Sequence, residues 1–238
     1  IYHEALSLAE HHAGLRGRIE QNLGILANIQ GDHTAALGHY RRSLDGFERD
    51  GDERGSAIAY HNLGMIATQR GELDEAEASF GRSAVIAARV GDVYLEGLCE
   101  LHRAEVSHAR KQYAEAMRRA EGALAIFEQI GARMDKSGAY TVVGMVFRDT
   151  GRPALAEVRL LSAMALAVET GWILGGAEAS RELARLYQIS GRNQEALTRL
   201  NQSHSLFNRL DARVDLVDIA KKMTDLEKSV AGKSKAME

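Results

Sequence analysis

Residues 57–96 read AIAYHNLGMIATQRGELDEAEASFGRSAVIAARVGDVYLE, and the rest of the chain follows the same pattern in steps of forty residues. We call a set of positions spaced forty residues apart a phase, and each position in it a slot. Two phases hold only small residues: the first comprises Gly24, Gly64, Ala104, Gly144 and Ala184, and the second comprises Ala36, Ala76, Ala116, Ala156 and Ala196. Two further phases hold Gly31, Gly71, Gly151, Gly191 and Gly51, Gly91, Gly131, Gly171, with Lys111 and Asp211 in the remaining slots. Self-similarity at a fixed period indicates a stacked repeat array.

Each repeat is predicted to be a pair of helices, A and B. In the first repeat, Gly17 to Gln30 forms helix A, residues 31–33 form a turn, and residues 34–49 form helix B. Glycine just past the last helical residue is a usual C-terminal stop, and apolar residues recur between these stops at helical spacing. Pro153 falls at the start of the fourth helix B, where a missing N–H is tolerated.

The small residues are expected where helices cross closely. A side chain larger than a methyl group would push the two backbones apart, so the alanine and glycine phases mark the A–B crossing. A third small phase in helix B lets the next helix A approach, and it comprises Ser43, Ser83, Ala123, Ala163 and Ser203.

The motif Asn62-Leu63-Gly64, followed by Ala67, Gly71 and Ala76-x3-Phe80, resembles the tetratricopeptide repeat signature, and the first repeat carries the same residue types. The resemblance covers about residues 17–211. The unit is longer than the standard repeat of about 34 residues, and it is similar to the elongated subtype of bacterial regulators and eukaryotic adaptors. The third unit departs most, with Arg103-Ala104 and Lys111. HEAT-like pairs have a similar length but lack the Leu-Gly and Ala-x3-aromatic phasing.

The resemblance implies an all-α, right-handed superhelix of five helix-turn-helix units with a helix at each end. The units are expected at residues 17–56, 57–96, 97–136, 137–176 and 177–211. Residues 1–16 are predicted to be the second helix of a truncated preceding repeat. Residues 212–238 are predicted to be a capping or linker helix with a tail.

The composition of the chain excludes few functions, but it argues against nucleic acid and membranes as binding partners. The net charge of −3 gives no general attraction to nucleic acid or to acidic lipid. No signal peptide or apolar run long enough to span a bilayer occurs in the sequence. The single cysteine, Cys99, cannot form an internal disulfide, and its phase predicts a position in the core. We expect a cytoplasmic protein.

The resemblance implies that certain helix A phases face a concave groove that binds a peptide or protein segment. The candidate binding residues on these phases are Gln21, Asn22, Ile25, His61, Asn62, Met65, Leu101, His102, Glu105, Met145, Arg181 and Arg185. An asparagine amide donates and accepts at once, which suits a peptide bond, although these asparagines are equally typical of a helix surface. An exposed apolar line is expected in the groove at Met65, Leu98, Leu101, Val142 and Met145.

Several residues have more than one interpretation. Arg181 and Arg185 either bind an acidic group or pair with Glu178 and Glu182 on the same helix. In His102-x2-Glu105-x2-His108, the two histidines are offset by about a third of a turn around the helix. This offset is unfavourable for holding one metal ion, and we expect neither a metal nor a cofactor. Trp172 is either a packing residue or an exposed anchor. No nucleophile elbow, phosphate loop or kinase signature appears, so an enzyme is not predicted.

The leading hypothesis is therefore a non-catalytic interaction scaffold, the docking or sensory part of a larger bacterial regulator. A first alternative is a ligand- or signal-peptide sensor that controls an attached output domain. Residues 206–218 resemble the junction between such arrays and an HD-type phosphodiesterase domain, and a transcription regulator is the other output considered. A second alternative is a self-assembly module, so a homo-oligomer stays open.

Overall fold

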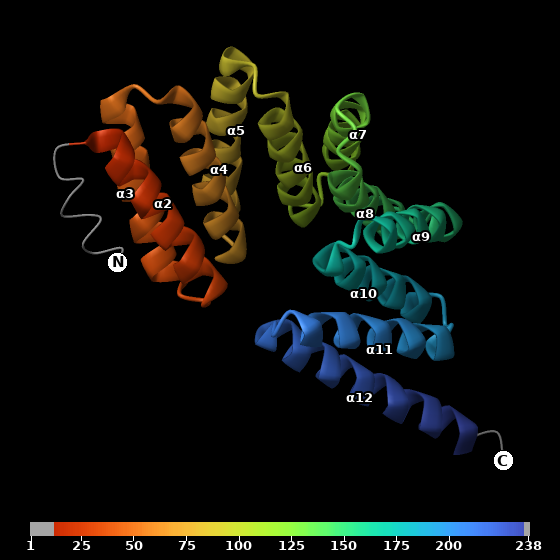
Figure 1. The fold of residues 1–238 in the computed structure, drawn as a ribbon. Helices are drawn as coiled ribbons and strands as arrows, with labels where there is room; N and C mark the ends of the chain where they lie inside the picture. The colour runs from red at the N-terminus through yellow and green to blue at the C-terminus, as the bar shows by residue number, and fades with distance from the viewer. Residues whose placement is uncertain (1–11, 236–238) are drawn as a thin grey trace. The chain divides into compact units, whose positions relative to one another are not determined.

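The computed structural model describes residues 12–235, and every regular element in that range is an α-helix. The A helices are α2 (Ala13–Ile29), α4 (Glu53–Gln69), α6 (Val93–Ala109), α8 (Arg133–Asp149) and α10 (Ile173–Ile189). The B helices are α3 (His33–Asp50), α5 (Leu73–Val90), α7 (Tyr113–Gln129), α9 (Pro153–Thr170) and α11 (Asn193–Arg209), and α12 (Arg213–Lys235) follows them (Figure 1). Within these residues, the predicted ten repeat helices and one terminal helix are confirmed.

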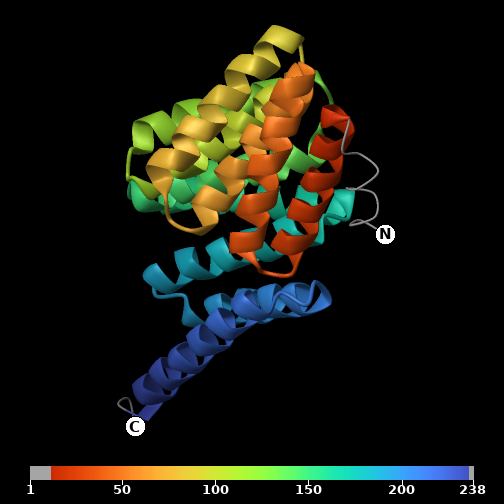
Figure 2. The ribbon, with the colours of Figure 1, turned by 90° about the vertical axis from the view of Figure 1, so that its left-hand side faces the viewer.

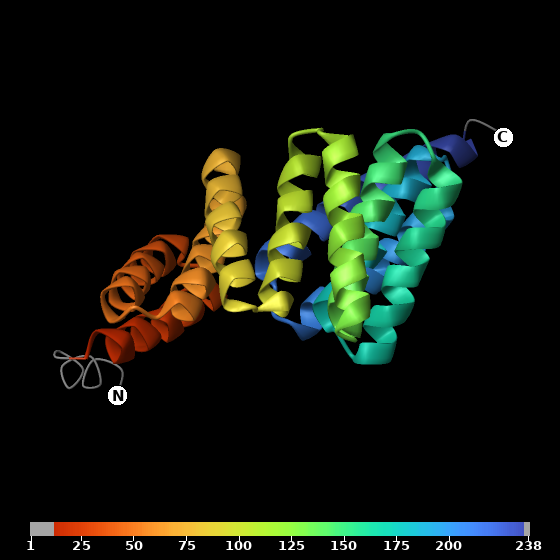
Figure 3. The same ribbon diagram turned by 90° about the horizontal axis from the view of Figure 1, so that it is seen from above.

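The chain divides into two compact units, residues 1–126 (unit 1) and residues 127–238 (unit 2), with the boundary inside α7. In unit 1, helices α2 to α6 each pack on the next helix in the chain (Figures 1 and 2). In unit 2, helices α8 to α12 do the same (Figure 3). Neighbouring A helices also touch, since α4 contacts α2 and α6, and α8 contacts α10. Each unit is thus a stack of helix pairs.

The turns between helices need a left-handed backbone. All eight turn glycines on the two glycine phases have φ between 70° and 79°, and a Cβ added to any of them would meet nothing within 4 Å. Conformation, not space, therefore selects glycine at these turns. Lys111 and Asp211 occupy the two remaining slots and adopt the same conformation, with φ of 61° and 51°.

The small phases lie at helix crossings, as predicted. A Cβ on Gly64 would lie 2.7 Å from Phe80, and one on Gly144 would lie 2.6 Å from Leu160. The five alanines of the invariant phase are all fully buried. In the third small phase, the Ser83 hydroxyl donates to the carbonyl oxygen of Ala57 at 2.8 Å.

Helix α2 begins at Ala13, four residues before the predicted start at Gly17. The first turn of α2 belongs to the first repeat because a Cβ on Gly46 of α3 would lie 2.8 Å from the Ala13 carbonyl oxygen. The rest of the predicted N-terminal helix, residues 1–11, lies outside the described residues. At the other end, α12 packs on α11 and buries Ile219 and Leu226.

Candidate functional site

The candidate residues lie on A helices in both units. Unit 1 carries nine of them: Gln21, Asn22 and Ile25 on α2; His61, Asn62 and Met65 on α4; and Leu101, His102 and Glu105 on α6. Unit 2 carries Met145 on α8 and Arg181 and Arg185 on α10.

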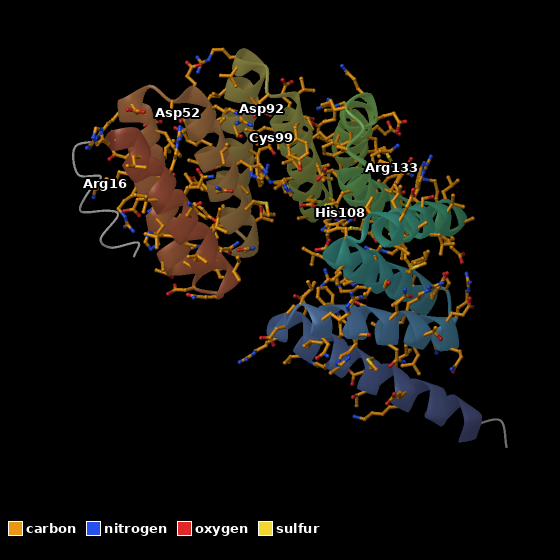
Figure 4. The ribbon with its side chains drawn as sticks, viewed as in Figure 1. Arg16, Asp52, Asp92, Cys99, His108 and Arg133 are labelled. Carbon is orange, nitrogen blue, oxygen red and sulfur yellow. The ribbon has the colours of Figure 1, made fainter. Side chains whose placement is uncertain are left out.

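Aspartate caps fix the start of α4 and α6. The Asp52 carboxylate accepts from the Gly55 N–H at 2.8 Å, and the Asp92 carboxylate accepts from the Leu95 N–H at 3.1 Å (Figure 4). A capping side chain satisfies one of the free N–H groups of the first turn and thereby sets the first residue of the helix. The two caps hold α4 and α6 in the same register, forty residues apart.

Unit 1 contains a cluster of three rings from three consecutive helices. The rings of His61 on α4 and His102 on α6 have centroids 5.0 Å apart. Phe80 of α5 lies 5.5 Å from His61 and stacks on His102 at 5.3 Å. The Nδ1 atom of His102 also lies 3.0 Å from a carboxylate oxygen of Glu105. The structure thus brings the candidate residues His61, His102 and Glu105 together, and the sequence gave no sign of the contact with Phe80.

The environment of His61 keeps its imidazole neutral. Burial, together with the neighbouring His102 ring, lowers the pKa of His61 to about 3. At neutral pH this imidazole is therefore a polar but uncharged group.

Three buried polar atoms on the A helices of unit 1 have no hydrogen-bond partner within residues 12–235: Asn28 Oδ1, His61 Nε2 and Asn62 Nδ2. We call these three atoms the open polar set. A buried unsatisfied polar atom costs about 1–3 kcal/mol, so each one calls for an explanation. Asn28 lies on the same helix as the candidates Gln21, Asn22 and Ile25 but was not among the candidate residues.

The predicted exposed apolar line is wrong. Leu101 and Val142 are buried, with 5% and 2% of their surface exposed, and Met65, Leu98 and Met145 are half-buried. The physical reason is that each A helix contacts the neighbouring A helix as well as B helices, so these side chains fill the seams. Met65, for example, packs on the cluster that contains Phe80 and Val106. Ile25 is the exposed apolar candidate, at 39%.

The candidate arginines of unit 2 are already paired. Arg185 donates to Glu182 at 3.2 Å, and Arg181 donates to Asp215 of α12 at 2.7 Å. Glu182 also accepts from Arg148 of α8, and both of these side chains are less than 10% exposed. Internal ion pairing is observed for both arginines, but only Arg185 hydrogen-bonds within its own helix as predicted, because the hydrogen-bond partner of Arg181 is Asp215 on α12.

The third repeat contains a charge network that sequence reasoning missed. Arg103 donates twice to Glu77 of α5, at 2.9 Å and 2.6 Å, and once to Glu100 at 3.1 Å. Arg119 of α7 donates to the same Glu100 at 3.1 Å. The sequence did contain a signal for this network. Arg103 stands where the first two repeats have the leucine of Leu-Gly, and Glu77 stands where the first repeat has Leu37, so an apolar pair is replaced by two opposite charges.

Cys99 and Trp172 are packing residues. Cys99 is fully buried as predicted, its thiol donates to the Ser83 hydroxyl at 3.2 Å, and burial raises its pKa to about 11. Trp172 is half-buried at the start of α10, with its ring against Gly175, where a Cβ would lie 2.0 Å away. It borders a cavity of about 260 Å³ together with Val168 and Leu206.

The described residues hold neither a metal-binding cluster nor a membrane-spanning helix. No group of three or more His, Cys, Asp and Glu side chains in residues 12–235 could hold a metal ion. No helix in the same range is long and apolar enough to cross a membrane.

Residues 15–87 match the family model described as tetratricopeptide repeat. The fold is similar to BtubC (BKLC) from P. vanneervenii, at 18% identity and a TM-score of 0.67 over 88% of each chain. It is also similar to a Rap protein complexed with competence and sporulation factor, at 14% identity and a TM-score of 0.68, covering 92% of this chain and 76% of that one.

A third similar structure is a signal transduction ATPase with a tetratricopeptide repeat sensor from Pyrococcus horikoshii, at 14% identity and a TM-score of 0.65. The match covers 99% of this chain and 41% of that one. A comparison with curated proteins gives no match. The tetratricopeptide resemblance and the all-α repeat fold are thereby confirmed, and the forty-residue subtype stays a prediction.

Proposed function

We propose that this array of tetratricopeptide repeats is a non-catalytic interaction module whose A helices in unit 1 bind an extended segment of another protein. The open polar set carries the proposal. A peptide backbone offers N–H donors and C=O acceptors, and the Asn28 oxygen accepts while the Asn62 amide donates. The neutral imidazole of His61 donates or accepts according to its tautomer.

The surroundings favour an uncharged stretch of backbone with apolar side chains. Ile25 and Met65 offer apolar surface on the same A helices, and His61 carries no charge at neutral pH. Gln21, Asn22, His102 and Glu105 extend the polar surface on α2 and α6. Met145, Arg181 and Arg185 stay secondary candidates, because Met145 is half-buried and both guanidinium groups already have acidic partners.

The test is a selection from a peptide display library on the immobilised chain, followed by calorimetric titration of the selected peptide. Asn62→Ala and Asn28→Ala each remove a directional hydrogen bond worth about 0.5–1.5 kcal/mol, so each should weaken binding about 2- to 10-fold. Met65→Asp should abolish it. Arg41→Glu on the exposed face of α3 is the control. If Arg41→Glu abolishes binding and the other three changes leave it intact, the assignment is wrong.

A sensor with an attached output domain is the second candidate. Helix α12 begins at Arg213, inside residues 206–218, the stretch that resembles a junction with an output domain. The similar ATPase from Pyrococcus horikoshii is described as having a tetratricopeptide repeat sensor. The reading frame beyond Glu238 tests this candidate. A catalytic or DNA-binding signature there favours a cytoplasmic sensor, whereas a stop codon favours a free-standing adaptor.

A further inference from the structure

Helix α9 of unit 2 exposes an apolar face. Leu155 is 49% exposed, Val158 is 58% exposed and Val168 is 73% exposed, and Ala165 between them is also exposed. We call these four residues the α9 stripe. A surface helix of a globular protein normally carries polar residues on its solvent-facing side. A run of exposed aliphatic side chains on that side indicates a contact surface.

The other repeats show that the array does not need these side chains. The slot of Leu155 holds Ala35, Glu75, Glu115 and Glu195, and the slot of Val158 holds Gly38, Ala78, Arg118 and Thr198. The slot of Val168 holds Glu48, Ala88, Glu128 and Asn208. Since none of these slots repeats a large aliphatic residue, packing within the repeat does not explain the stripe. The inner side of α9 already packs through Leu160 and Ala163, which are fully buried.

We propose that the α9 stripe is the contact surface for a second copy of this chain, with the two α9 helices antiparallel. A two-fold axis between Leu161 and Ser162 sets Leu155 opposite Val168 and Val158 opposite Ala165. Each pair sets a larger side chain against a smaller one, as interdigitated helix packing requires. No charged side chain falls on the axis, where a two-fold contact would bring it against its own copy.

The charges beside the stripe have the sign that an antiparallel pair needs. Arg152 just before α9 and Arg159 in its N-terminal half have no acidic partner among the described residues, and the one acidic residue of that half, Glu157, is already bonded to Arg192 and Tyr187. The C-terminal half carries Glu169, which is 52% exposed and bonds Arg133. An antiparallel arrangement sets the basic half of one helix against the acidic half of the other. It also sets the positive end of each helix dipole beside the negative end of its neighbour.

The size of the stripe fixes the strength of the association. From Leu155 to Val168 the stripe covers fourteen residues, or about 20 Å of helix. A contact limited to that length buries less than the roughly 1,200 Å² of a specific stable complex, so the dimer is weak. We expect a dissociation constant between about 10 μM and 1 mM.

Sedimentation velocity over a concentration series up to about 1 mM tests the association. The wild-type chain should shift from monomer to dimer, and the double change Val158→Glu, Val168→Glu should weaken dimerisation at least tenfold. The matched control is Thr198→Glu, Asn208→Glu, which introduces the same charges at the same register slots of α11. Circular dichroism checks that both variants fold.

Cross-linking tests the geometry without changing the stripe. Ser162→Cys lies beside the proposed axis, so two copies should form a disulfide readily under mild oxidation. Gln202→Cys, at the same slot of α11, should form one far more slowly, and the native Cys99 is buried and does not compete. Equal cross-linking of both variants would overturn the antiparallel contact.

Two other results would overturn the proposal. One is a dimer that both double variants weaken equally or leave unchanged. The other is a chain that stays monomeric over the whole series. If that monomer sediments with vesicles of anionic phospholipid and the Val158→Glu, Val168→Glu variant does not, the stripe serves a lipid surface instead.

Discussion

Buried polar side chains on the A helices are all paired in the described part of unit 2 but only some of them are paired in unit 1, where Glu20 of α2 bonds His39 and Arg42. In unit 1, buried atoms of Asn28, His61 and Asn62 have no partner among the described residues. In unit 2, Glu182 is 4% exposed but accepts from both Arg148 and Arg185. No buried side-chain nitrogen or oxygen in the described part of unit 2 lacks a partner.

Equivalent positions of the repeat therefore have different roles in the two units. His102 and Glu182 occupy equivalent slots, yet the first belongs to a ring cluster and the second to an ion-pair network. Charges paired inside the chain contribute to stability and offer little to a ligand. Polar atoms left unpaired weaken the fold slightly and leave hydrogen-bonding capacity for a partner.

Removing one charge from the network of unit 2 should have the largest effect. Glu182→Ala leaves Arg148, whose side chain is 8% exposed, with Asp149 as its remaining acid. Breaking a buried ion pair on one side costs about 3–5 kcal/mol, and the surviving contact keeps the loss near about 3 kcal/mol. Urea denaturation measures it. Arg185→Ala, at a side chain 48% exposed, is the control and should cost less than about 1 kcal/mol. Equal losses would mean that the network is not structural.

Lowering the pH should reduce the free energy of unfolding through the buried imidazole of His61 in unit 1. The folded pKa of His61 is about 3, whereas unfolded histidine titrates near about 6.5. Between these values the unfolded chain binds the extra proton, so stability falls as pH drops from about 6.5 toward 3, by at most about 1.4 kcal/mol per pH unit. Above that window His61 contributes no pH dependence.

The measurement compares the wild-type chain with His61→Phe, which cannot titrate. The stability of the variant relative to the wild type should rise by up to about 2 kcal/mol between pH 7 and pH 5. Parallel pH profiles for the two proteins would show that His61 is not buried in its neutral form.

The fold was predictable from the sequence because its signals are local and repeated. Gly31 and Gly71 stop helices, Ala76 and Ala116 mark crossings, and each signal recurs at the same phase. Even the departure at Lys111 followed the register, since its backbone takes the same left-handed turn as the glycines.

The candidate site was only partly predictable, because exposure depends on neighbours that one helix does not reveal. Leu101 has a groove phase, but the contact between α4 and α6 buries it. Pairing also depends on residues far apart in sequence, as with Arg181 and Asp215. Periodicity identifies the face of a helix, whereas the partner of each side chain depends on how adjacent helices pack.

Deleting a polar group in unit 1 should not destabilise the chain, in contrast to Glu182→Ala. Asn62→Leu removes a buried amide nitrogen that has no partner and keeps a similar volume. Removing an unsatisfied group relieves its desolvation cost, so we expect a gain of about 1 kcal/mol in the free energy of unfolding. Peptide binding should weaken about 2- to 10-fold at the same time, as for Asn62→Ala. Thermal and urea denaturation measure the first effect and calorimetry the second, and a loss of stability with binding intact would make Asn62 a purely structural residue.

The smallest expected effect is one that both units should share. Lys111 in unit 1 and Asp211 in unit 2 occupy slots where the other repeats have glycine, with φ of 61° and 51°. A side chain in the left-handed region costs about 1–2 kcal/mol, and replacement by glycine also adds unfolded-state entropy worth about 0.4–1 kcal/mol. Lys111→Gly and Asp211→Gly should therefore each stabilise the chain by about 0.5 kcal/mol. Gly71→Lys, which places a side chain at the same φ, should lower stability by a similar amount. If the two glycine variants are unstable instead, Lys111 and Asp211 make contacts that outweigh backbone strain, and the turn chemistry differs between repeats.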